Sequence, residues 1–163
     1  MRLFYYLFIT FILISCSNNV ELIFDEDNGG LFLPTGFQSL VVHEGVGQSR
    51  HIAVNENGDI YVKLRLDYGR KGNVALRDKN GDGKADIIQR FGDYPNDGRF
   101  ATEMKINEGY LYYSSERVVY RQKLSSKKLI PDSPVEVILT DPFPIRWHNA
   151  KSIAFDKENH MYV

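Results

Sequence analysis

The sequence has little cysteine, no surplus of charge of either sign and only one long apolar run. Cys16 is the single Cys among 163 residues, so no intramolecular disulfide can form. The 20 Lys and Arg residues balance 21 Asp and Glu residues, and the absence of a basic stripe argues against a nucleic-acid partner. No long segment keeps a 3.6-residue apolar period, which excludes a coiled coil or a helical repeat. Aromatic residues make up 13%, as is typical of strand-rich chains.

What the sequence does contain is alternating apolar residues around a turn. In residues 50–62, Ile52 and Val54 precede the dipeptide Asn57-Gly58, and Ile60 and Val62 follow it. Asn and Gly tolerate the positive φ angles of a tight type I′ turn, so this stretch predicts a β-hairpin.

The same pattern occurs twice more. Residues 151–163 repeat Ile-Ala, a turn and Tyr-Val in register with residues 50–62, and residues 104–113 are a weaker copy. The copies are roughly 50 residues apart, which is the spacing of propeller blades. We therefore predict an all-β fold, a β-propeller of which about two and a half blades lie in residues 31–163. Three unrelated hairpins are the alternative.

The remaining strands are predicted from apolar runs bounded by Gly, Pro and polar residues. They lie at 37–42, within 63–76 as one or two strands, and at 87–90, 118–124 and 135–139. A closed propeller of six blades at this spacing needs about 300 residues. We accordingly expect the chain to be the N-terminal part of a larger protein, truncated and inactive by itself.

The N-terminus has the features of an export signal. Arg2 precedes an apolar run, Leu3–Ile14, that is too short to span a bilayer. The run ends in Leu-Ile-Ser-Cys16, which resembles the lipobox of bacterial lipoproteins, where a peptidase cuts before the Cys and its thiol is lipidated. We predict a lipoprotein signal peptide at 1–15 and a lipid anchor at Cys16 that holds the exported protein on a membrane of the bacterial cell envelope. A plain secretion signal or a buried N-terminal segment is the alternative.

The segment after the anchor is acidic and rich in Asn and Gly. Such a composition favours a solvated chain, so residues 16–30 are predicted to be a flexible tether and residues 31–163 the propeller part.

Residues 78–86 resemble the first part of an EF-hand-type Ca²⁺ loop. Oxygen side chains occupy loop positions 1, 3, 5 and 9, and Gly occupies position 6. The candidate ligands are the side chains of Asp78, Asn80, Asp82 and Asp86 and the backbone carbonyl of Lys84. Gln89 replaces the expected Glu at position 12, so we predict a structural Ca²⁺ site that is weaker than, or different from, an EF-hand. A surface turn rich in Asx and Gly is the alternative.

Several stretches together resemble one enzyme family. They are LPTGF at 33–37, IAVNENGDIYV at 52–62, VALRDKNGDGKAD at 74–86 and HNAKSIAFD at 148–156. Their order resembles the N-terminal third to half of the glucose/sorbosone dehydrogenase family, over about residues 31–163. Members of that family are six-bladed propellers that oxidise sugars with pyrroloquinoline quinone (PQQ). The resemblance implies PQQ and Ca²⁺ as cofactors, a sugar or aldose as substrate, and a respiratory electron acceptor or a cytochrome as partner.

The resemblance also implies roles for individual residues. His148 precedes an inner strand, where the family has the His that takes a proton from the sugar hydroxyl, and a His with a pKa of about 6.5 suits that task. Arg99 and Arg50 are candidates to bind the cofactor, and His51 and Trp147 stand beside such positions. A loop His bonded to backbone, and Arg side chains that are merely solvated, are the alternatives.

The sequence thus predicts a membrane-anchored, PQQ-dependent sugar dehydrogenase of the glucose or sorbosone type. Two other functions remain open at this point. One is a non-catalytic propeller that serves as a binding scaffold, as in NHL proteins. The other is a propeller hydrolase similar to lactonases, which would use carboxylate and Asn metal ligands.

Overall fold

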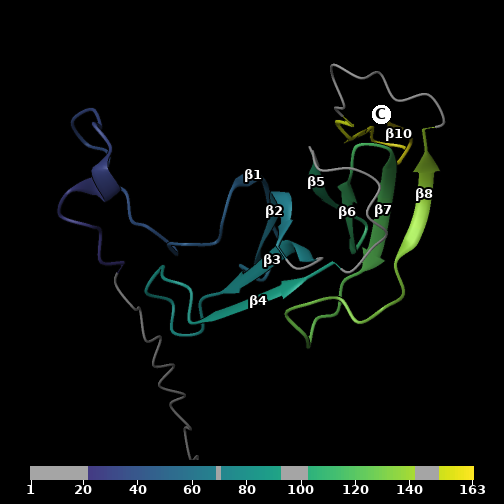
Figure 1. The fold of residues 1–163 in the computed structure, drawn as a ribbon. Coiled ribbons are helices and arrows are strands. Elements are labelled where there is room, and N and C mark those ends of the chain that lie inside the picture. The colour runs from purple at the N-terminus through teal and green to yellow at the C-terminus, as the bar shows by residue number, and fades with distance from the viewer. Residues whose placement is uncertain (1–21, 69–70, 93–102, 142–150) are drawn as a thin grey trace, which may run out of the picture.

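The structure is a computed structural model that describes residues 22–163 except 69–70, 93–102 and 142–150 (Figure 1). Strands make up nearly all of its regular structure. Within these described residues no helix is long and apolar enough to cross a membrane. The elements are η1 (Asn28–Gly30), β1 (Ser49–Val54), β2 (Ile60–Tyr68), β3 (Lys71–Arg77), β4 (Ile87–Phe91), β5 (Met104–Asn107), β6 (Tyr110–Ser114), β7 (Val118–Lys123), β8 (Glu136–Thr140), β9 (Ala154–Phe155) and β10 (Met161–Tyr162).

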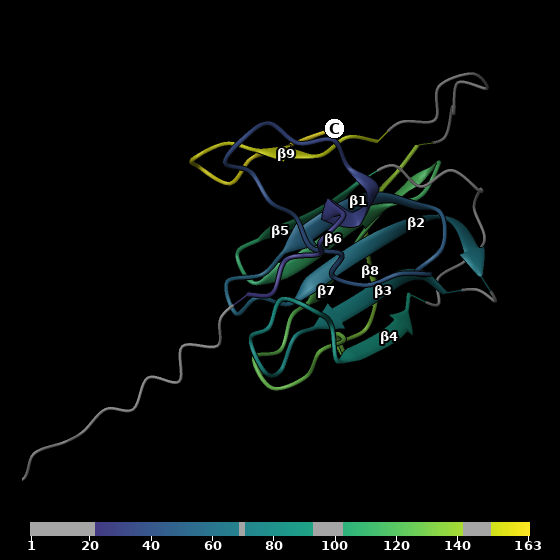
Figure 2. The same cartoon turned by 90° about the vertical axis from the view of Figure 1, so that its left-hand side faces the viewer.

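The strands form two four-stranded antiparallel sheets and a final hairpin. In each large sheet the strands follow one another in chain order, β1-β2-β3-β4 and then β5-β6-β7-β8, and β9 pairs with β10 (Figures 1 and 2). Each large sheet is therefore one up-and-down meander of the kind that forms a propeller blade. The predicted all-β architecture of two blades and an opening hairpin is confirmed, and so are the predicted strands at 87–90, 118–124 and 135–139.

The strand predicted at 37–42 is absent. The backbone there bonds to the segment before it and to Ala85, whose N donates to Val42 O at 2.9 Å, and forms no strand ladder. Asp25 N donates to Ser39 O at 3.1 Å, Ser39 N donates to Asn28 Oδ1 at 3.2 Å, and Val41 N donates to Asp25 Oδ2 at 2.6 Å. The polar groups near one end of the predicted tether, 16–30, are thus bonded to residues 39–41.

The first hairpin has a three-residue loop. Asn55 N donates to Asp59 O at 2.8 Å, Gly58 N donates to Asn55 O at 2.9 Å, and Gly58 has a φ of 86°. Asn57 does not adopt a positive φ, so the predicted type I′ turn at Asn57-Gly58 is wrong. The geometry is that of a three-residue loop closed by one left-handed residue, which only the Gly supplies.

The other two hairpins show how far the repeat extends. In the third hairpin Asp156 N donates to His160 O and Asn159, with a φ of 65°, takes the place of the left-handed Gly. The first and third turns therefore have the same form in register. The second turn is shorter and is of the type I′ kind, since Glu108 and Gly109 have φ angles of 48° and 72°.

The main core lies between the two blades. Tyr61 is fully buried, its ring meets that of Phe91 edge-on at 6.1 Å, and its hydroxyl donates to Leu129 O at 2.9 Å. This inter-blade core consists of Tyr61, Ala75, Phe91, Met104, Leu111, Tyr113, Val118, Tyr120 and Leu129. Burying a large apolar side chain contributes about 1.5–3 kcal/mol, so this core holds the blades face to face.

Two smaller clusters cover the outer faces of the blades. On the far face of the first blade, Val42 and Val46 of the N-terminal segment pack against a buried cluster of strands β2 and β3. On the far face of the second blade, Tyr112 and Val119 pack with Ile153 and with Phe155 of the last hairpin. The three units therefore stack in chain order, as successive propeller blades do.

Candidate functional site

The first strands of the two blades meet at a hollow. Residues 51–54 of β1, residues 104–106 of β5 and Glu103, which directly precedes β5, line a cavity of about 350 Å³. Each of the two is the first strand of its sheet, so their starting residues lie where successive blades come together. A site here would be shared between blades, which is the usual position of a ligand site in a propeller channel.

Three polar residues line this hollow: His51 and Glu103, which contact each other, and the exposed Lys105. His51 Nδ1 lies 3.0 Å from Glu103 Oε1, and 41% of the His51 side chain is exposed against 9% of the Glu103 side chain. The carboxylate is thus inside the protein and the imidazole is at the opening of the cavity.

Three parts of the chain fix the position of Glu103. Besides His51 of the first blade, its Oε1 accepts from Met104 N of the second blade at 2.9 Å. Its Oε2 accepts from Ile153 N, just before the last hairpin, at 3.4 Å. Its own backbone N donates to Ser114 Oγ at 3.1 Å, and its carbonyl accepts from Ser114 N at 3.1 Å. The buried carboxylate therefore joins both blades and the start of a third.

This arrangement decides which imidazole nitrogen faces a ligand. A carboxylate only accepts hydrogen bonds, so a neutral His51 must carry its proton on Nδ1. Nε2 is then left with a lone pair that can accept a hydrogen bond or a proton. A carboxylate that orients a His in this way is the pattern of general-base sites.

The cations near this end of the blades differ in their surroundings. Arg50 is exposed and lies where the register of β1 shifts, between Ser49 and His51. Arg50 is not among the residues that line the hollow. Lys151 Nζ lies 2.8 Å from Asp141 Oδ2, in an ion pair whose Lys side chain is only 13% exposed. Of these two cations, Arg50 is the one that solvent reaches freely.

Four predicted residues lie outside the described part of the chain. They are His148, Arg99, Trp147 and Cys16. The catalytic role of His148, the cofactor contact of Arg99 and the lipidation of Cys16 stay predictions.

The predicted Ca²⁺ loop is a compact turn built by its own side chains. The Asp78 carboxylate accepts from the backbone N of Asn80, Gly81 and Gly83 at 2.7–3.0 Å. These backbone donors, that of Gly83 first, lower the pKa of Asp78 below its usual value of 3.8. Asn80 Oδ1 accepts from Asp82 N, and Asp82 Oδ1 accepts from Lys84 N. In both bonds the donor is two positions after the acceptor.

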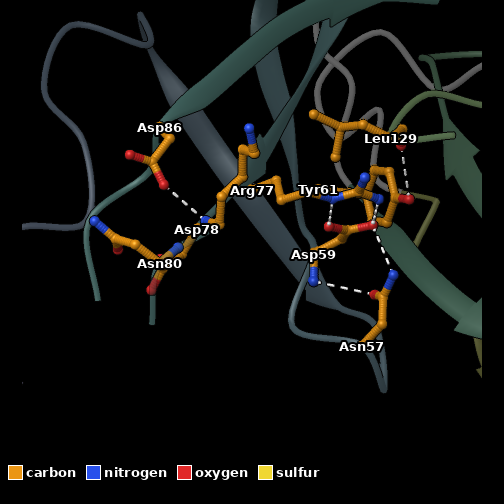
Figure 3. A network of polar contacts seen from close by, with 9 residues as sticks. Asn57, Asp59, Tyr61, Arg77, Asp78, Asn80, Asp86 and Leu129 are labelled. Carbon is orange, nitrogen blue, oxygen red and sulfur yellow. Dashed lines mark hydrogen bonds and ion pairs between the residues drawn. The ribbon is translucent and has the colours of Figure 1, made fainter. Parts of the chain in front are cut away.

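The position of the loop is fixed at its base and at its tip. Figure 3 shows the base, where Arg77 lies between Asp59 and the loop. At its base Asp86 N donates to Arg77 O at 2.9 Å, and the Arg77 guanidinium bonds both carboxylate oxygens of the buried Asp59 at 2.6 Å. Asp86 Oδ2 accepts from Lys79 N at 2.7 Å. At its tip Gly83 leaves no room for a side chain, since a Cβ there would lie 2.7 Å from Leu40 Cδ2.

The loop carboxylates do not converge on one point. Across the described residues, the one group of three or more acidic or His ligand atoms within 4.8 Å of one another is Asp156, Glu158 and His160. The Asp156 carboxylate there already accepts from three donors of its own turn, His160 N, His160 Nδ1 and Glu158 N, and from the Tyr162 hydroxyl. The Ca²⁺ site at Asp78, Asn80, Asp82, Lys84 and Asp86 stays a prediction.

Comparison with known proteins adds to this description. No protein-family model matches the chain, and no curated protein matches its sequence. Among solved structures, the chain is similar to the holo form of the PQQ domain of pyranose dehydrogenase from Coprinopsis cinerea, with a TM-score of 0.57. The fold is that of part of a β-propeller. The match is 11% identical and covers 72% of this chain but 27% of that chain, so the described blades correspond to about a quarter of the length of the solved domain.

Sequence reasoning missed Glu103, the buried carboxylate of the hollow between β1 and β5. A usable signal was present, because aligning the three hairpins on Ile52, Met104 and Ile153 places His51 and Glu103 at equivalent blade starts. Equivalent positions of successive blades meet around a propeller axis, which brings these two residues together.

Proposed function

We propose that the chain forms the first two and a half blades of a membrane-anchored, PQQ-dependent sugar dehydrogenase of the glucose or sorbosone type. The observation that carries the proposal is the fold similarity to the PQQ domain of a pyranose dehydrogenase. The motifs of residues 31–163 that resemble the glucose/sorbosone dehydrogenase family, noted independently of that similarity, support the same assignment.

The chain's own residues would have the following tasks. Arg50 and Arg99 would offer guanidinium groups to the carboxylates of the cofactor, for which the exposure of Arg50 at the start of β1 leaves room. His148 would accept the proton of the sugar hydroxyl. When bound, PQQ supplies the two-electron oxidant, and Ca²⁺ next to it polarises a carbonyl.

The proposal includes the location of the protein. Lipid attached to Cys16 after removal of residues 1–15 would anchor the domain to a membrane of the bacterial cell envelope. Several acyl chains on one residue bind a bilayer firmly, whereas a single chain binds only marginally. An anchored enzyme could pass electrons to a respiratory acceptor or a cytochrome at the same membrane.

The test is sugar-dependent reduction of an artificial electron acceptor by the native protein supplied with PQQ and Ca²⁺. We expect reduction with an aldose and none without PQQ. His148→Ala should lower kcat by about 10²–10⁴-fold, the usual contribution of a general base. The matched control is His43→Ala, since His43 is an exposed residue of the N-terminal segment.

Two outcomes would count against the proposal. A folded native protein that reduces no acceptor with any aldose would favour a non-catalytic binding scaffold. Full activity of His148→Ala would remove the assignment of the base while leaving the reaction in place.

A further inference from the structure

We propose that His51 and Glu103 form a binding site for a hydroxyl-bearing ligand, a sugar or a polyol, at the start of the inner strands. In this site His51 Nε2 accepts the hydrogen bond of a ligand hydroxyl, and Glu103 is a positioning residue that holds the imidazole. The choice of a sugar as ligand rests on the proposed function. The site itself rests on the geometry of β1 and β5 and requires no cofactor.

The hydrogen-bond acceptor, His51 Nε2, is preorganised. Glu103 has only 7% of its surface exposed, and its carboxylate is held by His51, by Met104 N and by Ile153 N. Because these partners belong to successive blades, the carboxylate cannot swing away without disturbing the contact between blades. The imidazole it holds is therefore presented in one orientation, which lowers the entropy that a ligand would lose on binding.

The hollow has the size and the mixed lining of a small-molecule site. A cavity of about 350 Å³ lies within the size range of such sites. Its lining combines the polar side chains of His51, Glu103 and Lys105 with the apolar ones of Ile52, Val54, Met104 and Ile106. Such a mixed lining suits a sugar, which has C–H faces and hydroxyl edges.

The stability of the fold does not require the His51 side chain. Backbone N–H groups of Met104 and Ile153 already satisfy the buried carboxylate. A hydrogen bond from an imidazole that is 41% exposed contributes little to folding, about 0.5–1.5 kcal/mol. A purely structural role therefore predicts that loss of the His51 ring changes little, whereas a binding role predicts loss of the ligand.

The experiment is a titration of the native protein, labelled with ¹⁵N in its His rings, with D-glucose in the absence of PQQ. The His51 signals, identified from their loss in His51→Gln, should show the proton on Nδ1 in the free protein. Addition of D-glucose should shift the Nε2 signal saturably. His51→Gln should abolish binding measured by calorimetry, and Glu103→Gln should weaken it by about 10-fold and let both tautomers appear. His43→Gln is the matched control and should bind as the native protein does.

Three results would overturn the inference. The first is a proton on Nε2 in the free protein, the second is a His51 signal that glucose does not move, and the third is unchanged binding by His51→Gln. Because PQQ is left out, these results are separate from those of the dehydrogenase assay. Glucose binding without acceptor reduction would support this site and contradict the proposed enzyme. Acceptor reduction together with a His51 signal that glucose does not shift would support the proposed enzyme and contradict this site.

Discussion

Tyr61 is the side chain whose removal should separate the two blades most directly. It is fully buried in the inter-blade core, and its hydroxyl donates to Leu129 O, which belongs to the second blade. Tyr61→Phe keeps the ring but leaves that buried carbonyl without its donor, which costs about 1–3 kcal/mol. Tyr61→Ala also removes the ring next to Phe91, and truncation of a large aromatic residue costs about 3–5 kcal/mol.

The assay is urea unfolding of the whole chain, followed by tyrosine absorbance and by circular dichroism. The expected order of stability is native, then Tyr61→Phe, then Tyr61→Ala. The matched control is Tyr162→Ala, since Tyr162 is 58% exposed on the last hairpin and should lose less than about 1 kcal/mol. A Tyr61→Ala variant as stable as this control would refute the inter-blade core as described.

Burial also gives Tyr61 a distinct titration. Desolvation raises its pKa from 10.0 to about 12. The phenol then keeps its proton in the folded chain at a pH where the unfolded chain has lost it. Its contribution to stability is therefore complete below about pH 10 and is lost as the pH rises toward 12. Burial also raises the pKa of Tyr113, so spectrophotometric titration should show one fewer late-ionising tyrosine in Tyr61→Phe than in the native chain.

Further predictions concern the polar contacts. Asp59→Asn should cost about 3–5 kcal/mol in urea unfolding, because it leaves the Arg77 guanidinium without the buried carboxylate that it contacts at 2.6 Å; equal stability would contradict this. The pKa of Asp25 is lowered from 3.8 by the Val41 backbone donor and by Lys84. The contribution of Asp25 to folding stability is therefore complete above about pH 4 and is lost as the pH falls through the lowered pKa. Asp25→Asn should therefore flatten the drop in melting temperature between about pH 7 and about pH 3, and an unchanged drop would argue against this contact. If the loop at 78–86 binds Ca²⁺, a chelator should lower the melting temperature of the native chain and not that of Asp82→Ala, whereas identical calorimetric Ca²⁺ titrations of the two would end the idea.

The sequence was most informative about local β structure. Alternation around residues 50–62, 104–113 and 151–163 identified all three hairpins, because side-chain periodicity and turn residues are local properties. The turn type was missed at Asn57-Gly58, since the dipeptide fits both a two-residue loop and the end of a three-residue loop.

Predictions that depend on distant partners were less successful. Phe37–Val42 has the composition of a strand, yet its backbone bonds to Asp25 and Asn28, and composition does not specify a pairing partner. Glu103 gains its role from groups on both blades and on the segment before β9, about 50 residues away in either direction. Only the fold brings these groups together.

The central claim is that these blades belong to a PQQ-binding propeller. The most direct measurement is equilibrium binding of PQQ to the native protein isolated from the membrane fraction, with Ca²⁺ present and followed by the absorbance of the quinone. We expect saturable binding of one PQQ per propeller, weakened by about 10-fold in Arg50→Gln because a charge-assisted contact to a carboxylate is lost. A folded native protein that binds no PQQ would contradict the claim.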